Sequence, residues 1–155
     1  MSRNERGVTL IEIVIVLALV VIVGKAALLV SFDSYRDSSF RTDRMALVTA
    51  LEHARAESIG GVCEAAPCTD AQPHGVMIGS STYIVFEGPD YASRDQDADV
   101  SIEANPATLR SGLMEIVFAT SSGDVAHPGT IILTDTASRT STITVGDEGQ
   151  ISWSN

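Results

Sequence analysis

The sequence predicts an α+β fold, in which a long N-terminal α-helix is followed by an antiparallel β-sheet or a small β-sandwich. Three observations support this fold class. An apolar run lies near the start of the chain, no proline occurs before Pro67, and short segments rich in β-branched residues follow Pro73. The 155 residues suffice for one domain of ordinary size plus an appendage.

The apolar run is the first element of the predicted helix. Eleven consecutive apolar residues extend from Ile13 to Val23, and a helix that crosses a bilayer needs about 20 mostly apolar residues. Residues 8–30 reach that length if Glu12 and Lys25 are tolerated. A secretory signal peptide is the alternative, but "GKAA" is only a weak cleavage site for it.

An amphipathic pattern continues the helix beyond Val30. Apolar or small side chains recur at three- and four-residue steps, with charged side chains between them. The predicted buried face comprises Phe40, Leu47, Leu51, Ala54 and Ser58. We therefore expect helix from about Val8 to Ile59, ended by the pair Gly60-Gly61.

The remaining chain alternates between strand and turn signals. Seven segments have strand composition: residues 74–78, 82–87, 98–104, 114–120, 130–134, 141–146 and 149–153. The first two flank a predicted hairpin turn at Gly79 to Ser81. Residues 89–99, "PDYASRDQDAD", read as a polar loop.

The charge balance excludes one class of partner. The formal net charge is −10, and the chain beyond Val30 has seven Arg, no Lys and eighteen acidic residues. Nucleic-acid surfaces rely on clustered Lys and Arg, so this composition argues against nucleic acid and against anionic lipid headgroups. It is compatible with a soluble face outside the cytoplasm.

Cys63 and Cys68 are the two cysteines, in "GVCEAAPC". In an oxidising compartment a disulfide between them would close a small loop and stabilise the fold by about 2 kcal/mol. A zinc site would need about four ligands, and His74 is the only other suitable side chain nearby. Two free buried thiols remain the other alternative.

The position of Glu12 within the apolar run needs a functional explanation. A carboxylate in the bilayer interior costs about 3 kcal/mol, and Lys25 lies too far along the helix to offset it. If the chain were cut after Gly7, the new amine of Val8 would lie one helical turn from Glu12. Glu12 could equally reach the amine of an adjacent molecule.

The segment "RGVTLIE" resembles the processing signal of type IV prepilins and type II secretion pseudopilins. The resemblance implies that a membrane peptidase cuts between Gly7 and Val8 and methylates the amine of Val8. It also implies that Glu12 pairs with a neighbour's amine in a filament. The partners implied are other pilins or pseudopilins, the prepilin peptidase, an inner-membrane assembly platform and the membrane itself.

A second resemblance concerns the helix end and the last strand. "HARAES" is similar to an Ala-Arg-x-Glu-Ala pattern in GspH/FimT-type minor pseudopilins, with Ser58 in place of the final Ala. The closing "GDEGQISW" fits their Gly-Arg-hydrophobic ending, with Gln150 in place of the Arg. The resemblance implies a minor pilin or pseudopilin of a type IV pilus or a type II secretion pseudopilus.

The alternative function is a minor pilin that binds a ligand. FimT-like proteins in competence pili contact DNA through basic residues, but residues 140–155 contain no Arg or Lys. We expect four regions: a cleaved leader (1–7), a transmembrane and filament-core helix (8–30), its amphipathic continuation (31–60) and an extracytoplasmic β-rich domain (61–155). The protein would sit in the inner membrane as a single-pass protein and then join an extracytoplasmic filament.

No pattern in the sequence indicates an enzyme or a cofactor. His53, His74 and His127 lack the spacing of a metal site, and no nucleophile elbow or phosphate-binding loop occurs. Asp95, Asp97 and Asp99 alternate as at the start of a calcium loop, but the Gly and Glu of such a loop are missing. A solvated acidic loop is favoured over a calcium site. Trp153 is expected to pack along the last strand rather than form an exposed contact.

Overall fold

The computed structural model describes residues 9–64 and 70–155, including the side chains of all of these except residues 26–33. The chain divides into two compact units, Met1–Ser38 and Ser39–Asn155. Helix α1, Leu10–Gly60, contributes to both units, and all strands belong to the second. This confirms the predicted α+β class with an N-terminal helix followed by antiparallel sheets.

The strands form two four-stranded antiparallel sheets. Sheet A has the order β3-β2-β1-β5 and sheet B the order β4-β6-β7-β8. The strands of sheet A are β1 (His74–Ile78), β2 (Thr82–Glu87), β3 (Asp95–Glu103) and β5 (Glu115–Phe118). Those of sheet B are β4 (Leu109–Gly112), β6 (Gly129–Thr134), β7 (Thr140–Val145) and β8 (Ile151–Ser154).

Most of the predicted strands are confirmed. The expected hairpin joins β1 to β2, with Ile78 paired to Tyr83. Two expectations were wrong. Strand β4 was not predicted, because it is short and ends at Gly112 (φ 95°), which weakens a strand signal. The polar loop of residues 89–99 ends earlier than expected, because β3 already begins at Asp95 and pairs with Glu87.

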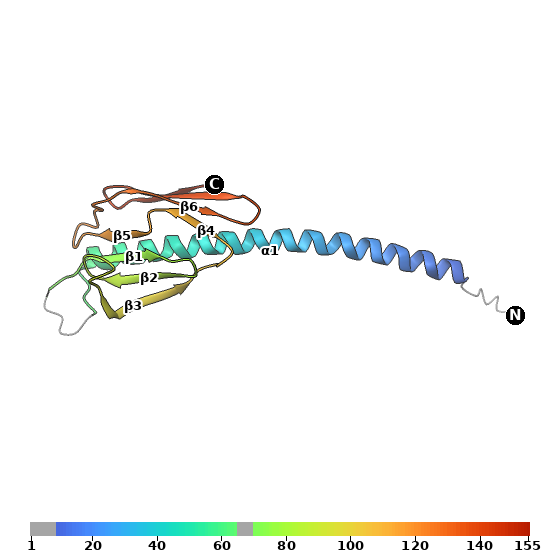
Figure 1. The fold of residues 1–155 in the computed structure, drawn as a ribbon, viewed down its shortest axis with the longest axis horizontal. Coiled ribbons are helices and arrows are strands. Elements are labelled where there is room, and N and C mark those ends of the chain that lie inside the picture. Colours follow the sequence, from blue (N-terminus) through green and yellow to red (C-terminus); the bar gives the residue numbers. More distant parts are fainter. Residues whose placement is uncertain (1–8, 65–69) are drawn as a thin grey trace, which may run out of the picture. The chain divides into compact units, whose positions relative to one another are not determined.

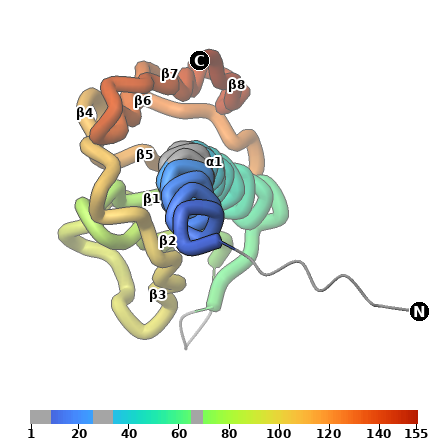
Figure 2. Tube along the Cα trace, turned by 90° about the vertical axis from the view of Figure 1, so that its right-hand side faces the viewer, coloured from blue at the N-terminus to red at the C-terminus, as the bar shows by residue number. Residues whose placement is uncertain are grey.

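The second half of α1 lies between the two sheets. Figures 1 and 2 show sheet B on one side of this part of the helix and β1, β2 and β3 on the other. The predicted buried face of the helix is confirmed, since Phe40, Leu47, Leu51, Ala54 and Ser58 are at most 5% exposed. These side chains and inward-facing residues of both sheets make one apolar core. The helix therefore packs against both sheets.

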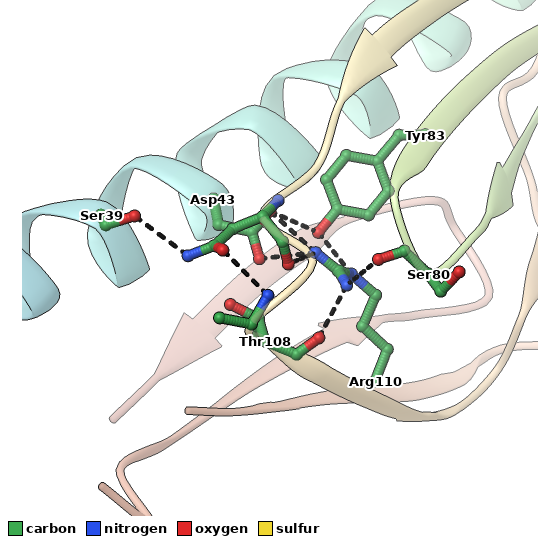
Figure 3. Close-up of polar contacts among 8 residues, drawn as sticks. Ser39, Asp43, Ser80, Tyr83, Thr108 and Arg110 are labelled. Atoms are coloured by element: carbon green, nitrogen blue, oxygen red, sulfur yellow. Dashed lines mark hydrogen bonds and ion pairs between the residues drawn. The ribbon is translucent and has the colours of Figure 1, made fainter. Parts of the chain in front are cut away.

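A buried ion pair links the helix to both sheets. The side chains of Asp43 in α1 and Arg110 in β4 are 1% and 2% exposed, and the guanidinium contacts the carboxylate at 2.8 Å. Tyr83 of β2 donates its hydroxyl to Asp43 at 3.0 Å, and the Asn105 backbone donates to the same oxygen at 2.8 Å. Figure 3 shows these groups converging on Asp43.

The Arg110 guanidinium is fully satisfied in this site. Each of its five N–H groups has an acceptor. The acceptors are the Tyr83 hydroxyl, the Asp43 carboxylate and the backbone carbonyls of Ser80, Asn105 and Thr108. Such saturation is what offsets the desolvation of a buried ion pair. Burial raises the pKa of Tyr83 well above its ordinary value and outweighs the Arg110 hydrogen bond, which lowers it.

Ser58 forms a second attachment at the end of the helix. Its hydroxyl accepts a hydrogen bond from the backbone N–H of His74 at 2.8 Å and donates to the Phe118 carbonyl at 3.0 Å. The Ser58 carbonyl also accepts from the Ser121 N–H at 2.8 Å. Ser58 thereby joins α1 to β1 and β5. The helix ends where predicted, because Gly61 adopts a left-handed φ of 62°.

Candidate functional site

The start of α1 is the candidate site, because it contains Glu12 within the apolar run. The Thr9 carbonyl accepts hydrogen bonds from the N–H groups of Glu12 at 3.0 Å and Ile13 at 3.3 Å, which closes the first turn. Glu12 is exposed in this first turn, where the helix dipole favours a carboxylate. None of the described residues pairs with its side chain.

The apolar residues around Glu12 are exposed on all sides of the helix. Every large apolar side chain from Leu10 to Val23 is 51% to 81% exposed. A surface helix of a globular protein would instead expose polar residues and bury one apolar stripe. This segment therefore presents a continuous apolar surface.

Within the part of the chain that the structure describes, no helix combines the length and apolar character that a membrane crossing requires.

Three residues of the predicted sites lie outside the described residues. They are Gly7 and Val8, at the expected cleavage point, and Cys68. The cleavage between Gly7 and Val8 and the disulfide between Cys63 and Cys68 therefore stay predictions.

The three aspartates of the calcium-like pattern lie at the start of β3. Asp99 forms an ion pair with Arg94 at 2.9 Å, and Asp95 accepts a hydrogen bond from the Asp97 backbone N–H at 2.9 Å. No group of three or more metal-binding side chains is found among the described residues. The Arg94 guanidinium supplies the positive charge that neutralises Asp99 here.

Other side chains singled out in the sequence are dispersed over the domain. His53 is exposed and lies 3.3 Å from Glu57. His74 is buried in β1, with its Nε2 4.0 Å from Glu57. Trp153 was expected to pack along the last strand, yet it is 47% exposed, with the Arg44 guanidinium 5.3 Å from its ring centroid.

The sequence reasoning missed Asp43 and Arg110. Neither residue stands out locally, because an Asp followed by an Arg in an amphipathic helix reads as a solvated face. Arg110 lies 67 residues further along the chain in the strand that was not predicted. Only the fold brings the two charges together, so no local signal could have identified the pair.

Comparison with known families finds a known motif at the start of the chain. The model of the prokaryotic N-terminal methylation motif matches residues 2–24. The chain carries a prokaryotic N-terminal methylation motif. The matched residues contain Gly7, Val8, Glu12 and all of the exposed apolar segment up to Val23. The motif supports a type IV prepilin-like protein, which is a structural subunit rather than an enzyme.

The methylation motif also implies its general partners. Proteins with such a motif are processed by a prepilin peptidase, are anchored in the membrane, and assemble with other pilins into an extracellular filament. No significant match to a curated protein or to a solved structure is found for the chain.

Proposed function

We propose that the protein is a minor pilin or pseudopilin of the GspH/FimT type, a structural subunit of a type IV pilus or a type II secretion pseudopilus. The observation that carries the proposal is that the matched motif and the exposed apolar helix coincide. Residues 2–24 match the methylation motif, and all large apolar side chains from Leu10 to Val23 lack cover from the described chain. Lipid and neighbouring helices are the two environments that can cover such a surface on all sides.

Processing between Gly7 and Val8 would expose a new amine one helical turn before Glu12. The Glu12 carboxylate has no partner among the described residues and would pair with the methylated amine of a neighbouring subunit. In a low dielectric, the pairing of two such charges removes a large penalty that each would otherwise carry alone. Glu12 would thus select a specific register between adjacent helices.

The second unit suits the extracytoplasmic part of such a subunit. Its core is built from both sheets and the second half of α1, so the domain does not need the apolar segment for its packing. We place residues 8–30 in the inner membrane and then in the filament core, with the acidic β domain outside. A disulfide between Cys63 and Cys68 would form there, since disulfides persist in oxidising compartments.

N-terminal sequencing of protein from native membranes tests the processing step. The expected reading is Val-Thr-Leu-Ile-Glu, with the valine methylated, and Gly7→Asp should leave the leader attached. A chain that begins at Ala26 or later would show an ordinary signal peptide and contradict the proposal. Mass analysis without reductant should also show a peptide that joins Cys63 to Cys68.

Glu12→Leu tests the assembly contact. Membrane insertion should stay equal or improve, because a buried charge is removed. Incorporation into sheared filaments should fall, because the neighbour's amine loses its partner. Glu12→Asp, which keeps the carboxylate, is the matched control and should lose less incorporation than Glu12→Leu. Normal incorporation of the Glu12→Leu variant would show that Glu12 is not an assembly contact.

A further inference from the structure

A hollow opens on the second unit between α1 and the edge strand β8. It has a volume of about 370 Å³. Its lining residues are Met45, Val48 and Glu52 of the helix and Ile151, Ser152 and Trp153 of β8. Met45 and Trp153 are 48% and 47% exposed, so apolar surface remains open to solvent at this point. Sheet B ends at β8, and no described strand follows it beside the hollow.

Among the residues that the structure describes, no strand pairs with the outer edge of β8, which leaves backbone groups open beside the hollow. Strand β8 pairs with β7 on one side only, with Ser152 opposite Thr144 and Ser154 opposite Thr142. The Gly146 N–H donates to the Gln150 carbonyl, which sets Gln150, Ser152 and Ser154 as the residues that bond toward β7. The alternating residues Ile151 and Trp153 therefore direct their N–H and carbonyl groups away from the sheet.

The open backbone edge of β8 and the hollow lie next to each other, as the binding of an added strand requires. In an antiparallel pair, the backbone edge supplies hydrogen bonds, and a side-chain pocket next to it supplies selectivity. Here the side chains of Ile151 and Trp153 line the hollow, and their backbone groups face the open edge. An extended chain along β8 would place every second side chain over the apolar flank formed by Met45 and Val48.

The charge of the hollow indicates which residue a bound strand should carry. Glu52 is the only charged residue of the lining, it is exposed, and none of the described residues pairs with it. Arg44, which does not line the hollow, stacks on the Trp153 ring and donates to Asn155. The unpaired charge in the hollow is therefore negative and favours a Lys or Arg in the guest.

We propose that this hollow is a peptide-binding site, which takes an extended segment of a partner protein as a fifth strand of sheet B. The segment has an apolar side chain that enters between Met45 and Trp153, and two residues from it along the segment a basic residue that pairs with Glu52. The backbone of Ile151 and Trp153 binds it by hydrogen bonds. This site is independent of the proposed filament role, since it uses no residue of the methylation motif.

Trp153 is the single tryptophan of the chain, so its emission reports directly on the hollow. The probe is the capped peptide Thr-Lys-Thr-Leu-Thr-Val-Thr, whose Lys and Leu side chains face the same side of a strand, titrated into the full chain in detergent micelles. We expect a saturable blue shift of the emission as the leucine covers the indole ring. N-methylation of one backbone nitrogen that faces β8 should weaken binding about tenfold, because it removes a hydrogen bond and adds bulk at the edge.

Charge reversal tests the second contact. Glu52→Lys should weaken binding of the lysine peptide by roughly threefold and strengthen binding of a peptide with Glu in that place. Glu103→Lys, at an exposed position of β3, changes the net charge equally and should leave both affinities unchanged. This control separates the local contact from the overall negative charge of the protein.

Three results would overturn the proposal. One is a shift that does not saturate. Another is equal binding of the N-methylated peptide, which would indicate adsorption of the peptide to the micelle or to an apolar patch. The third is a dimer in sedimentation velocity that Glu52→Lys dissociates and the peptide does not, since the hollow would then be occupied by a second copy of the chain.

Discussion

Two stretches of the same helix have opposite relations to their surroundings. From Leu10 to Val23 nearly every residue is apolar, and the side chains are exposed around the whole circumference. From Phe40 to Ser58 the apolar residues recur at helical spacing, and the face they form is buried by the two sheets. Periodicity thus distinguishes a helical stretch that is buried by its own domain from one that must be buried by lipid or by other molecules.

The difference has an energetic basis. An amphipathic stretch can be stabilised by its own domain, because its polar face stays in water while its apolar face is buried. A stretch that is apolar on all sides is stabilised only when all of its sides are buried. A domain that packs against one side cannot bury the others. Substitutions in the second stretch should therefore change the stability of the β domain, and substitutions in the first should not.

The largest effect is expected for the buried ion pair. Arg110→Ala leaves the Asp43 carboxylate buried without its counter-ion and should lower the free energy of unfolding by about 3–5 kcal/mol. Arg36→Ala, an exposed arginine in the first unit, should cost at most about 0.5 kcal/mol. Urea denaturation of the purified chain, followed by Trp153 fluorescence, measures both. A loss of less than about 1 kcal/mol, as expected for a surface site, would contradict the stabilising role of the ion pair.

Two leucines test the comparison directly. Leu51 is fully buried and Leu17 is 59% exposed, so the same truncation removes core packing in one case only. Leu51→Ala should destabilise the β domain by about 2–5 kcal/mol. Leu17→Ala should change the free energy of unfolding of that domain by less than about 0.5 kcal/mol. Equal losses in the same urea experiment would mean that the two stretches of helix do not differ as described.

Ser58→Ala should have a smaller effect. The hydroxyl accepts from the His74 N–H and donates to the Phe118 carbonyl, and both partners are buried. Its removal leaves these backbone groups unsatisfied, at a cost of about 1–3 kcal/mol. If Ser58→Ala were neutral, the end of α1 would not need this attachment to β1 and β5.

The smallest effect is a dependence on alkaline pH. Burial raises the pKa of Tyr83 above its ordinary value of about 10. The folded protein then binds this proton more tightly than the unfolded chain does, so the contribution of Tyr83 to stability should be constant below pH 10 and fall as the pH rises above it. Tyr83→Phe should lower stability at neutral pH, because two hydrogen bonds are lost, and flatten the fall above pH 10. If the free energy of unfolding fell equally steeply above pH 10 in the unmodified protein and in the Tyr83→Phe variant, Tyr83 would be excluded as the cause of the fall.

The local rules predicted those parts of the fold that depend on neighbouring residues. The helix end at Gly60-Gly61, the buried face from Phe40 to Ser58 and the hairpin between β1 and β2 each follow from periodicity or turn chemistry. The division of the strands into two sheets around the helix was not predicted. It depends on pairings such as Arg110 with Leu133, which no local pattern encodes.

The candidate site shows the same limit. The resemblance of "RGVTLIE" to prepilins predicted the processing signal at Gly7, Val8 and Glu12, and the motif match covers those residues. The buried Asp43 and the half-exposed Trp153 could not be predicted, because their surroundings come from β4 and from the edge of sheet B. Sequence patterns therefore predict contacts with other molecules, but they did not predict the long-range contacts within this one.

The position of α1 inside its own domain affects how the chain is made. The apolar face that includes Leu47 and Leu51 precedes β6 and β7, which cover it, by some 80 residues. At ordinary rates of synthesis the ribosome needs on the order of 10 s to produce that stretch. During this interval the nascent chain exposes two apolar helical segments instead of one. A chaperone or targeting factor that engages the first segment would meet the second directly behind it, and its release would have to wait until β7 has emerged.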